Sequence, residues 1–134
     1  MADADRELIE AANAIIRQRY RPDWHVIGAA VRMTSGRIHT GVHLEANVGR
    51  IAVCAEAIAL GKAVSEGDEE IDTIVAVRHP RSEERDLEIQ IVPPCGMCRE
   101  MIADYGPRAR VIVADGNRFK ILKVSELLPE KYPG

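Results

Sequence analysis

The chain has 134 residues, of which 46% are hydrophobic, 29% are charged and 4% are aromatic. Its 18 basic and 21 acidic residues give a net charge of −3, which argues against the basic surface typical of proteins that bind nucleic acids or anionic membranes. The scarcity of aromatic side chains also argues against a platform on which nucleic-acid bases stack. A chain of this length is expected to form one domain over residues 1–134.

The beginning of the chain predicts a helix rather than a targeting segment. Residues 1–20 start with acidic side chains and contain no apolar stretch of the kind found in signal peptides. No segment approaches the roughly 18 apolar residues that a membrane-spanning helix needs. We therefore expect a cytoplasmic protein without a membrane partner, whose cysteines stay reduced.

In chain order, the first half predicts a helix, a hairpin and a second helix. Apolar residues recur at helical spacing over residues 4–20, where Asp3 or Asp5 can cap the start. The hairpin has its turn at residues 34–36, and its two strands are expected at 25–33 and 37–45. A helix rich in alanine and leucine follows over 54–66, and Gly67 can end it.

The second half alternates strands and helices. β-Branched residues over 71–79 predict a central strand, whereas the charged stretch over 80–88 is expected to be a solvated loop. A helix at 95–105 leads to a strand at 110–115, and a turn leads from there to the last strand and a short helical turn that Ser125 can cap. A strand, a helix and a second strand in succession favour a right-handed parallel crossover. The sequence thus predicts an α/β fold of three layers, with a mixed five-stranded sheet flanked by helices.

The three cysteines lie at or within one turn of expected helix starts. Cys54 begins one helix, Cys95 begins another, and Cys98 is one turn further on the same helix face as Cys95. Helix N-termini stabilise thiolates, and three thiolates suit zinc. Three protein ligands leave one coordination position open, as in catalytic zinc sites. A structural site would need a fourth ligand from the histidines, which are His25, His39, His43 and His79.

Two simpler interpretations compete with a zinc site. The cysteines could be ordinary buried thiols, although their ordered placement at two helix starts argues against this. Cys95 and Cys98 could also form a thioredoxin-like redox pair, but the site expected near an N-terminal βαβ unit is missing. The redox interpretation also leaves Cys54 and the glutamate two residues after it, Glu56, unexplained.

Glu56 lies on the first turn of the same helix as Cys54, beside the predicted metal. Zinc lowers the pKa of a bound water molecule toward neutrality. A carboxylate in this place can take a proton from that water and return it to a substrate nitrogen, which contributes on the order of 10²- to 10⁴-fold to the rate. Glu56 is therefore the predicted catalytic residue.

The segments "CAE" at 54–56 and "PCGMC" at 94–98 resemble the zinc-dependent cytidine deaminase superfamily. The similarity extends over most of the chain, to the hairpin "GAAV…SGRI", to "CAEAIALGKAVSEG" and to "ELLPEKY", as in the tetrameric cytidine deaminases and blasticidin-S deaminase. The resemblance implies that Cys54, Cys95 and Cys98 hold one zinc ion and that Glu56 moves protons while water attacks the amino-bearing carbon of a pyrimidine. It also implies a homotetramer.

The positions that contact the nucleoside in this family differ here. An Asn-x-Glu-Asn motif usually follows the second strand, whereas this chain has His43 and Ala46 in place of the asparagines and keeps Glu45. His25 replaces the usual aromatic residue before the first strand, and Ala57 replaces an arginine, as in blasticidin-S deaminase. By resemblance, the substrate-binding residues are His43, Glu45, Ala55, Trp24, His25 and Tyr132.

These observations lead to a functional hypothesis with alternatives. The chain is expected to be a zinc-dependent hydrolytic deaminase of a cytosine-type nucleoside, or of a nucleoside antibiotic such as blasticidin S, which it converts to the uracil-type product with release of ammonia. A standard cytidine or deoxycytidine deaminase of pyrimidine salvage is the first alternative. A non-catalytic zinc-binding module is the second, and a nucleic-acid-editing deaminase is disfavoured by the acidic balance and few aromatic residues.

Overall fold

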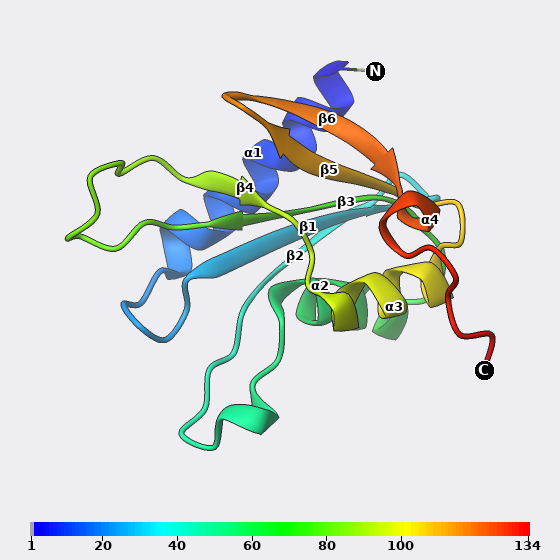
Figure 1. Cartoon of the computed structure of the whole chain (residues 1–134), viewed down its shortest axis with the longest axis horizontal. Helices are drawn as coiled ribbons and strands as arrows, with labels where there is room; N and C mark the ends of the chain where they lie inside the picture. The colour runs from blue at the N-terminus through cyan, green and yellow to red at the C-terminus, as the bar shows by residue number, and fades with distance from the viewer. Residues whose placement is uncertain (1) are drawn as a thin grey trace.

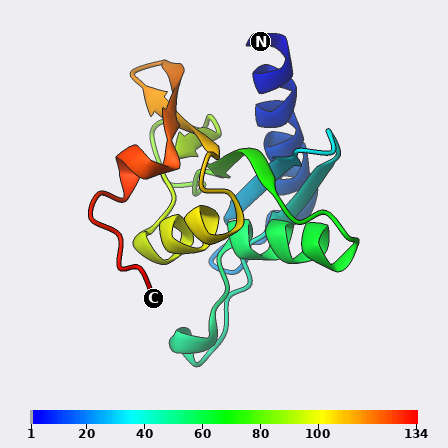
Figure 2. The same cartoon turned by 90° about the vertical axis from the view of Figure 1, so that its right-hand side faces the viewer.

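A computed structural model describes residues 2–134 and shows a sheet between two helical layers (Figures 1 and 2). The strands are β1 (Ile27–Met33), β2 (Ile38–Val42), β3 (Ile71–Arg78), β4 (Gln90–Val92), β5 (Arg110–Asp115) and β6 (Arg118–Lys123). The helices are α1 (Ala2–Arg19), the 3-10 helix η1 (Gly49–Ile51), α2 (Ala55–Ser65), α3 (Gly96–Tyr105) and α4 (Val124–Leu127). Within residues 2–134, none of these helices has the length and apolar character needed to cross a lipid bilayer.

The sheet is mixed and contains one strand more than the sequence predicts. The five predicted strands form the order β2-β1-β3-β5-β6, in which β3 and β5 pair in parallel and the other neighbours pair antiparallel. The parallel pair confirms the predicted βαβ unit. The additional strand, β4, pairs antiparallel with the end of β3 and leads directly into α3. Its three residues, which follow a charged stretch, are too few for a strand pattern to stand out.

Two predicted helix caps were wrong. Neither Asp3 nor Asp5 caps α1, because the helix already begins at Ala2 and both residues lie in its first turn. Ser125 lies inside α4, whose N-cap is Lys123, and the side chain of Glu126 accepts a hydrogen bond from the Lys123 N–H. The expected end of α2 is confirmed, since Gly67 has a φ of +92°, a conformation that favours glycine.

The two faces of the sheet bury separate apolar clusters. The α1 face packs residues of α1 against alternate positions of β1, β3 and β5, among them Leu8, Ala30, Val75 and Ile112. The opposite face packs α2, α3 and α4 against the intervening positions, and Cys98 lies in this cluster. Figure 2 shows α1 on one side of the sheet and both α2 and α3 on the other. Side-chain alternation therefore assigns the strand residues to the α1 face or to the α2/α3 face, except beside the register shift between Arg32 and Met33, where Ile71 and Thr73 lie on opposite faces.

The position of α2 against the sheet depends on a glycine in β2. A Cβ atom placed on Gly41 would lie 2.8 Å from the backbone nitrogen of Ala59 and 2.8 Å from a methyl carbon of Ile58. Such distances are shorter than ordinary van der Waals contact, so a side chain at residue 41 would push α2 outward. Because α2 begins next to Cys54, this close approach also sets the position of that residue and of Glu56.

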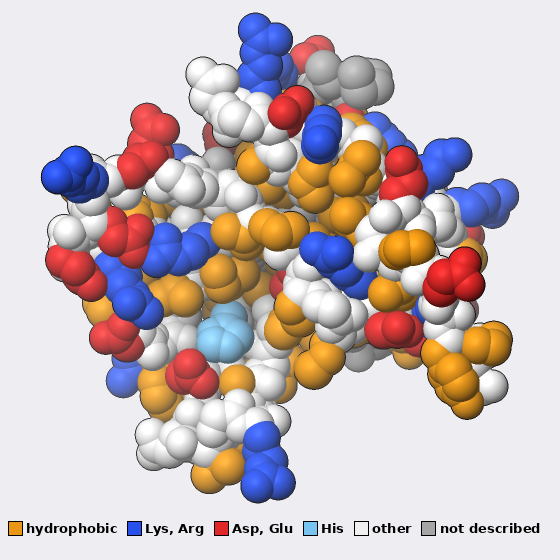
Figure 3. Space-filling view, viewed as in Figure 1, with side chains coloured by type: hydrophobic (Ala, Val, Ile, Leu, Met, Phe, Trp, Pro, Cys, Tyr) orange, Lys and Arg blue, Asp and Glu red, His pale blue; other side chains and the backbone are white. Residues whose placement is uncertain are grey.

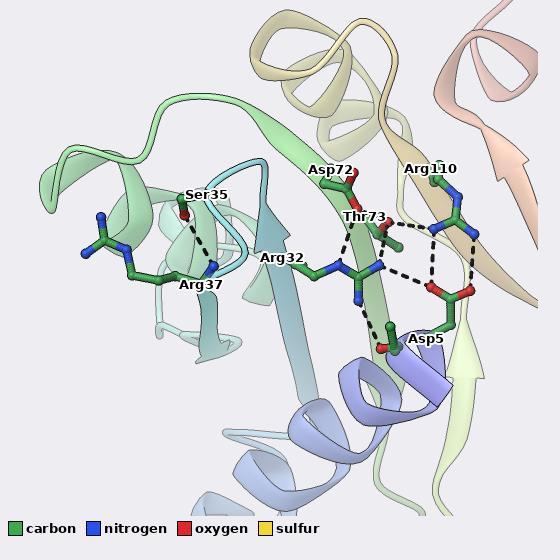
Figure 4. A network of polar contacts seen from close by, with 8 residues as sticks. Asp5, Arg32, Ser35, Arg37, Asp72, Thr73 and Arg110 are labelled. Carbon is green, nitrogen blue, oxygen red and sulfur yellow. Dashed lines mark hydrogen bonds and ion pairs between the residues drawn. The ribbon is translucent and has the colours of Figure 1, made fainter. Parts of the chain in front are cut away.

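On the α1 face, a fully buried carboxylate joins four elements (Figure 4). Asp5 of α1 accepts hydrogen bonds from Arg32 of β1 at 3.2 Å and from Arg110 of β5 at 3.1 and 3.3 Å. The hydroxyl of Thr73 in β3 accepts from both guanidinium groups, and Arg32 also pairs with Asp72. This network fastens α1 to β1, β3 and β5, so we regard α1 as part of the scaffold.

Candidate metal centre

The structure brings the three thiols together at the starts of two neighbouring helices. Cys54 is the N-cap of α2 and Cys95 is the N-cap of α3, and both have extended backbone conformations. Neither of these two residues has a side-chain cap hydrogen bond, so both sulfur atoms stay available. Cys98 lies in the first turn of α3 and is buried. The chain thus supplies three free thiols from two helices to one place.

The distances between the sulfur atoms fit a zinc ion. The Sγ atoms of Cys54 and Cys95 are 3.7 Å apart, and all three sulfur atoms lie within 4.8 Å of one another. Tetrahedral zinc–thiolate bonds of about 2.3 Å would place neighbouring sulfurs roughly 3.8 Å apart. In the described part of the chain, this trio is the one group of three or more potential ligands that gathers around a common point. Both the donor set and its spacing therefore suit zinc.

The protein environment shifts the pKa of each thiol. Burial raises the pKa of Cys54 and of Cys98 above the ordinary value of 9.0. Burial also acts to raise the pKa of Cys95, but the backbone N–H of Cys98, the neighbouring thiols and the N–H of Met97 outweigh it, so that this pKa is lowered. The exposed helix start at Cys95 thus favours a thiolate, as expected for a helix N-terminus.

Glu56 lies beside the thiols on the first turn of α2 and is 5% exposed. Burial raises the pKa of its carboxyl group above the ordinary 4.5, while its own backbone N–H, the Cys98 thiol and the nearby imidazole of His43 act to lower it. A buried carboxyl group with a raised pKa, next to three potential metal ligands, is suited to accept and release a proton.

His25, which precedes β1, contacts His43, which follows β2. The Nδ1 atom of His25 lies 2.8 Å from the carbonyl oxygen of His43, to which it donates a hydrogen bond. The Nδ1 atom of His43 is buried and has no hydrogen-bond partner. An unpaired buried nitrogen is costly, so the partner it lacks is expected to come from a bound molecule.

The other predicted substrate contacts lie in different surroundings. Glu45 accepts a hydrogen bond from the Ala46 N–H at 2.9 Å, and Ala55 is fully buried at the start of α2. The ring of Trp24 packs under the guanidinium of Arg21, at 5.3 Å from the ring centre. Tyr132, in the tail after α4, is 75% exposed. The structure therefore places His43 near Glu56, whereas Trp24 packs against Arg21 and Tyr132 is exposed on the tail.

Sequence reasoning missed an arginine on the face of the sheet that carries the thiols. In β3, Ile74 and Ala76 face α2 and α3, so the next alternate residue, Arg78, faces the same side. The sequence does not single out Arg78, because it lies just before the charged stretch over 80–88, where side chains are expected to be solvated. The signal that could have found it is its period-two spacing from two apolar core residues. Figure 3 shows histidine, acidic and basic side chains around hydrophobic ones where β1 begins and β2 ends.

Comparison with known proteins supplies the family context. A profile of the cytidine and deoxycytidylate deaminase zinc-binding region matches residues 2–114. The chain is 48% identical to blasticidin-S deaminase from Bacillus cereus over 98% of this chain and 94% of that protein. It is 33% identical to cytidine deaminase from Halalkalibacterium halodurans over 77% and 74% of the two chains. The crystal structure of cytidine deaminase from Burkholderia pseudomallei superposes with a TM-score of 0.78 at 26% identity, covering 95% of this chain and 98% of that one.

Proposed function

This chain belongs to the zinc-binding cytidine and deoxycytidylate deaminase family, and from that premise we propose that it deaminates an aminopyrimidine nucleoside or a nucleoside antibiotic such as blasticidin S. The chain is a zinc-dependent hydrolytic deaminase with one zinc ion per chain. The reaction replaces the exocyclic amino group by oxygen from water and releases ammonia. The observation that carries the proposal is the buried Glu56 beside three thiols of zinc-site spacing.

We assign the zinc ligands to Cys54, Cys95 and Cys98. Zinc in such a site supplies Lewis acidity, which makes water a nucleophile at neutral pH. Helix α2 holds the carboxylate of Glu56 beside this cluster, and burial keeps competing water away from it. Glu56 can therefore accept a proton from the attacking water and deliver it to the departing nitrogen.

We assign substrate recognition to residues around the same cluster. The unpaired Nδ1 of His43 offers a hydrogen bond to the substrate close to Glu56. Glu45 lies two residues after His43, and His25 is hydrogen-bonded to the His43 carbonyl oxygen. Both provide further polar contacts. On the family resemblance alone, Ala55, Trp24 and Tyr132 are further proposed contacts. The replacement of two family asparagines, at His43 and Ala46, favours a substrate other than plain cytidine.

A standard cytidine or deoxycytidine deaminase is the second candidate, favoured by the similarity to cytidine deaminases. It shares the chemistry and differs in the substrate. The two candidates are separated by relative kcat/KM values for cytidine, deoxycytidine, 5-substituted cytidines and blasticidin S, measured as ammonia release by the zinc-loaded protein.

A faster reaction with blasticidin S than with cytidine supports the first candidate, and the reverse order supports the second. Protein stripped of metal by a chelator is the control and is expected to be inactive. If the zinc-loaded protein deaminates none of these compounds, the proposed function is wrong and a non-catalytic zinc module becomes the better account.

We further propose that the chain is a single domain over residues 1–134 that works as a homotetramer in the cytoplasm. Free thiols suit a reducing compartment. The loop that carries η1 projects from the body of the molecule, and Val48 and Ile51 on it are 58% and 63% exposed (Figure 1). Exposed apolar side chains of this kind are typical of interaction surfaces. Light scattering is expected to give four times the mass of one chain, and a monomer would contradict the proposal.

A further inference from the structure

Four side chains form a row across the sheet on the face that carries the thiols. In register, Ile27 of β1 lies opposite Arg78 of β3, which in turn lies opposite Gln90 of β4. On the other side of Ile27, the N–H of His43 donates to the Ile27 carbonyl, so His43 extends the row. Directly opposite residues of paired strands share a face. Because Ile27 packs against the cluster that contains Cys98, the whole row faces α2 and α3.

The row extends from the neighbourhood of Glu56 to the guanidinium of Arg78. One end is His43, whose imidazole lies near the carboxyl group of Glu56. Arg78 lies two strands away, so the backbones of these two residues are roughly 10 Å apart at a strand spacing of about 4.8 Å. A molecule that presents a pyrimidine ring to Glu56 and lies along the row would bring its sugar side toward Arg78.

The guanidinium of Arg78 is held by one replaceable partner. It pairs with Glu84 through NH1 at 3.0 Å and through NH2, a fork geometry that matches a carboxylate or phosphate. Arg78 and Glu84 are 36% and 32% exposed, so the pair is partly in water and contributes little stability. Glu84 lies on the loop between β3 and β4, outside any helix or strand. An anion of the substrate can therefore take the place of Glu84.

We propose that Arg78 determines specificity by binding an anionic group on the sugar side of the substrate, so that the enzyme prefers aminopyrimidine nucleosides carrying a carboxylate or a phosphate. The inference rests on the proposed deaminase function and adds the substrate's charge to it. In the free enzyme Glu84 occupies the position of that anion. The geometry that carries the inference is the row of His43, Ile27 and Arg78 beside Glu56.

The test compares three substrates that differ only at the sugar. These are cytidine, cytidine 5′-monophosphate and cytidine 5′-carboxylic acid, each measured with the wild-type enzyme, Arg78→Gln and Arg78→Lys. The wild type should prefer at least one anionic substrate. Arg78→Gln should lower the ratio of anionic to neutral kcat/KM on the order of 10- to 100-fold, mainly through KM, as for the loss of hydrogen bonds to a charged group. Arg78→Lys should recover part of the ratio, because it keeps the charge without the fork.

The two anion sources give separate results. If the larger loss occurs with the carboxylate, the natural substrate carries a carboxylate, and if it occurs with the phosphate, the substrate is a nucleotide. Arg108→Gln is the matched control, because Arg108 is an exposed arginine in the turn before β5 that pairs with Glu70. It should leave the ratio unchanged. Glu84→Gln removes the competing carboxylate and should raise the affinity for the anionic substrates several-fold.

A second measurement keeps this inference separate from the proposed reaction. Calorimetry of uridine, uridine 5′-monophosphate and uridine 5′-carboxylic acid measures binding of product-like ligands without turnover. Tighter binding of an anionic ligand that is lost in Arg78→Gln supports the inference even if no substrate is deaminated. Equal affinity of the wild type for neutral and anionic ligands, or an unchanged ratio in Arg78→Gln, would show that Arg78 only anchors the loop through Glu84.

Discussion

The two faces of the sheet use arginine in opposite ways. On the α1 face, Arg32 and Arg110 converge on the fully buried Asp5 and also reach Thr73, so their charges are shared among several protein groups (Figure 4). On the α2/α3 face, Arg78 has a single half-exposed carboxylate partner on a loop. Arg32 and Arg110 thus share several acceptors within the protein, whereas Arg78 depends on one carboxylate.

The same contrast extends to the uncharged groups. The α2/α3 face also contains three free thiols around one point and a buried imidazole nitrogen of His43 without a partner. On this face the thiols, the unpaired nitrogen of His43 and the carboxyl group of Glu56 lie near one another, whereas the Asp5 network is bonded within the protein. The predictions below change one face at a time.

The largest effect is expected from removal of the carboxylate on the α2/α3 face. Glu56→Gln keeps the size of the side chain and removes its ability to take a proton, so kcat/KM for ammonia release should fall by about 10²- to 10⁴-fold. Zinc content and the midpoint of thermal unfolding should stay close to those of the wild type. Activity at the wild-type level would show that another group carries the proton.

On the α1 face, Asp5→Asn should reduce stability and leave the chemistry intact. The substitution leaves two guanidinium groups without their shared anion, and since both are partly exposed we expect a loss of roughly 2–3 kcal/mol, below the range for fully buried pairs. Asp3→Asn, which changes an exposed acid in the same helical turn, is the control and should have little effect. Urea unfolding measures both, and equal midpoints for the two variants would contradict the scaffold role.

A smaller effect is expected where α2 approaches β2. Gly41→Ala introduces a methyl group 2.8 Å from the Ala59 nitrogen, which should destabilise the protein by about 1–3 kcal/mol. It should also lower kcat, because α2 carries Glu56. Gly61→Ala, on α2 with no atom near its added carbon, should instead stabilise the helix by roughly 0.5–1 kcal/mol. Similar behaviour of the two variants would argue against a tight contact at residue 41.

The smallest effect concerns the pH dependence of stability. It involves neither the Asp5 network nor Arg78. The hydrogen bond from His39 at 2.9 Å, together with Ser35 and Arg37, holds the pKa of Asp68 below its ordinary 3.8 despite burial. Its stabilisation is therefore complete above about pH 4 and is lost as pH falls through the lower folded-state pKa. In Asp68→Asn, the free energy of unfolding should therefore fall less on acidification than it does in the wild type.

The control for Asp68 is Glu66→Gln, because Glu66 faces the other nitrogen of His39 at 3.9 Å and is 58% exposed. It should leave the acid-side slope as in the wild type. An unchanged slope in Asp68→Asn as well would assign acid unfolding to other carboxylates.

Much of the fold could be predicted because its elements have strong local patterns. The β-branched run at 71–78 and the alanine-rich helix at 55–65 were found within a residue of their observed bounds. The short strand β4 could not be found, because its three residues are held by pairing with β3 rather than by their own pattern. Asp5 was mistaken for a cap, because its partners Arg32 and Arg110 are brought to it only by tertiary packing.

The site residues also fall into two groups, those that local motifs predict and those that depend on tertiary packing. The zinc ligands and Glu56 could be proposed from two short motifs, since their spacing reports the chemistry directly. Arg78 could not, because its direction depends on strand register and on which face α2 and α3 cover. Period-two spacing indicates which face of β3 carries Arg78, but only the pairing of β1, β2 and β3 brings it into one row with His43.

The most direct test of the account is X-ray absorption at the zinc edge of the purified enzyme, with and without a product-like ligand. If Cys54, Cys95 and Cys98 form a catalytic centre, the spectrum should show three sulfur ligands and one oxygen or nitrogen ligand that changes when the ligand binds. Four protein ligands that do not change, with a histidine completing the set, would contradict it and identify a closed structural site.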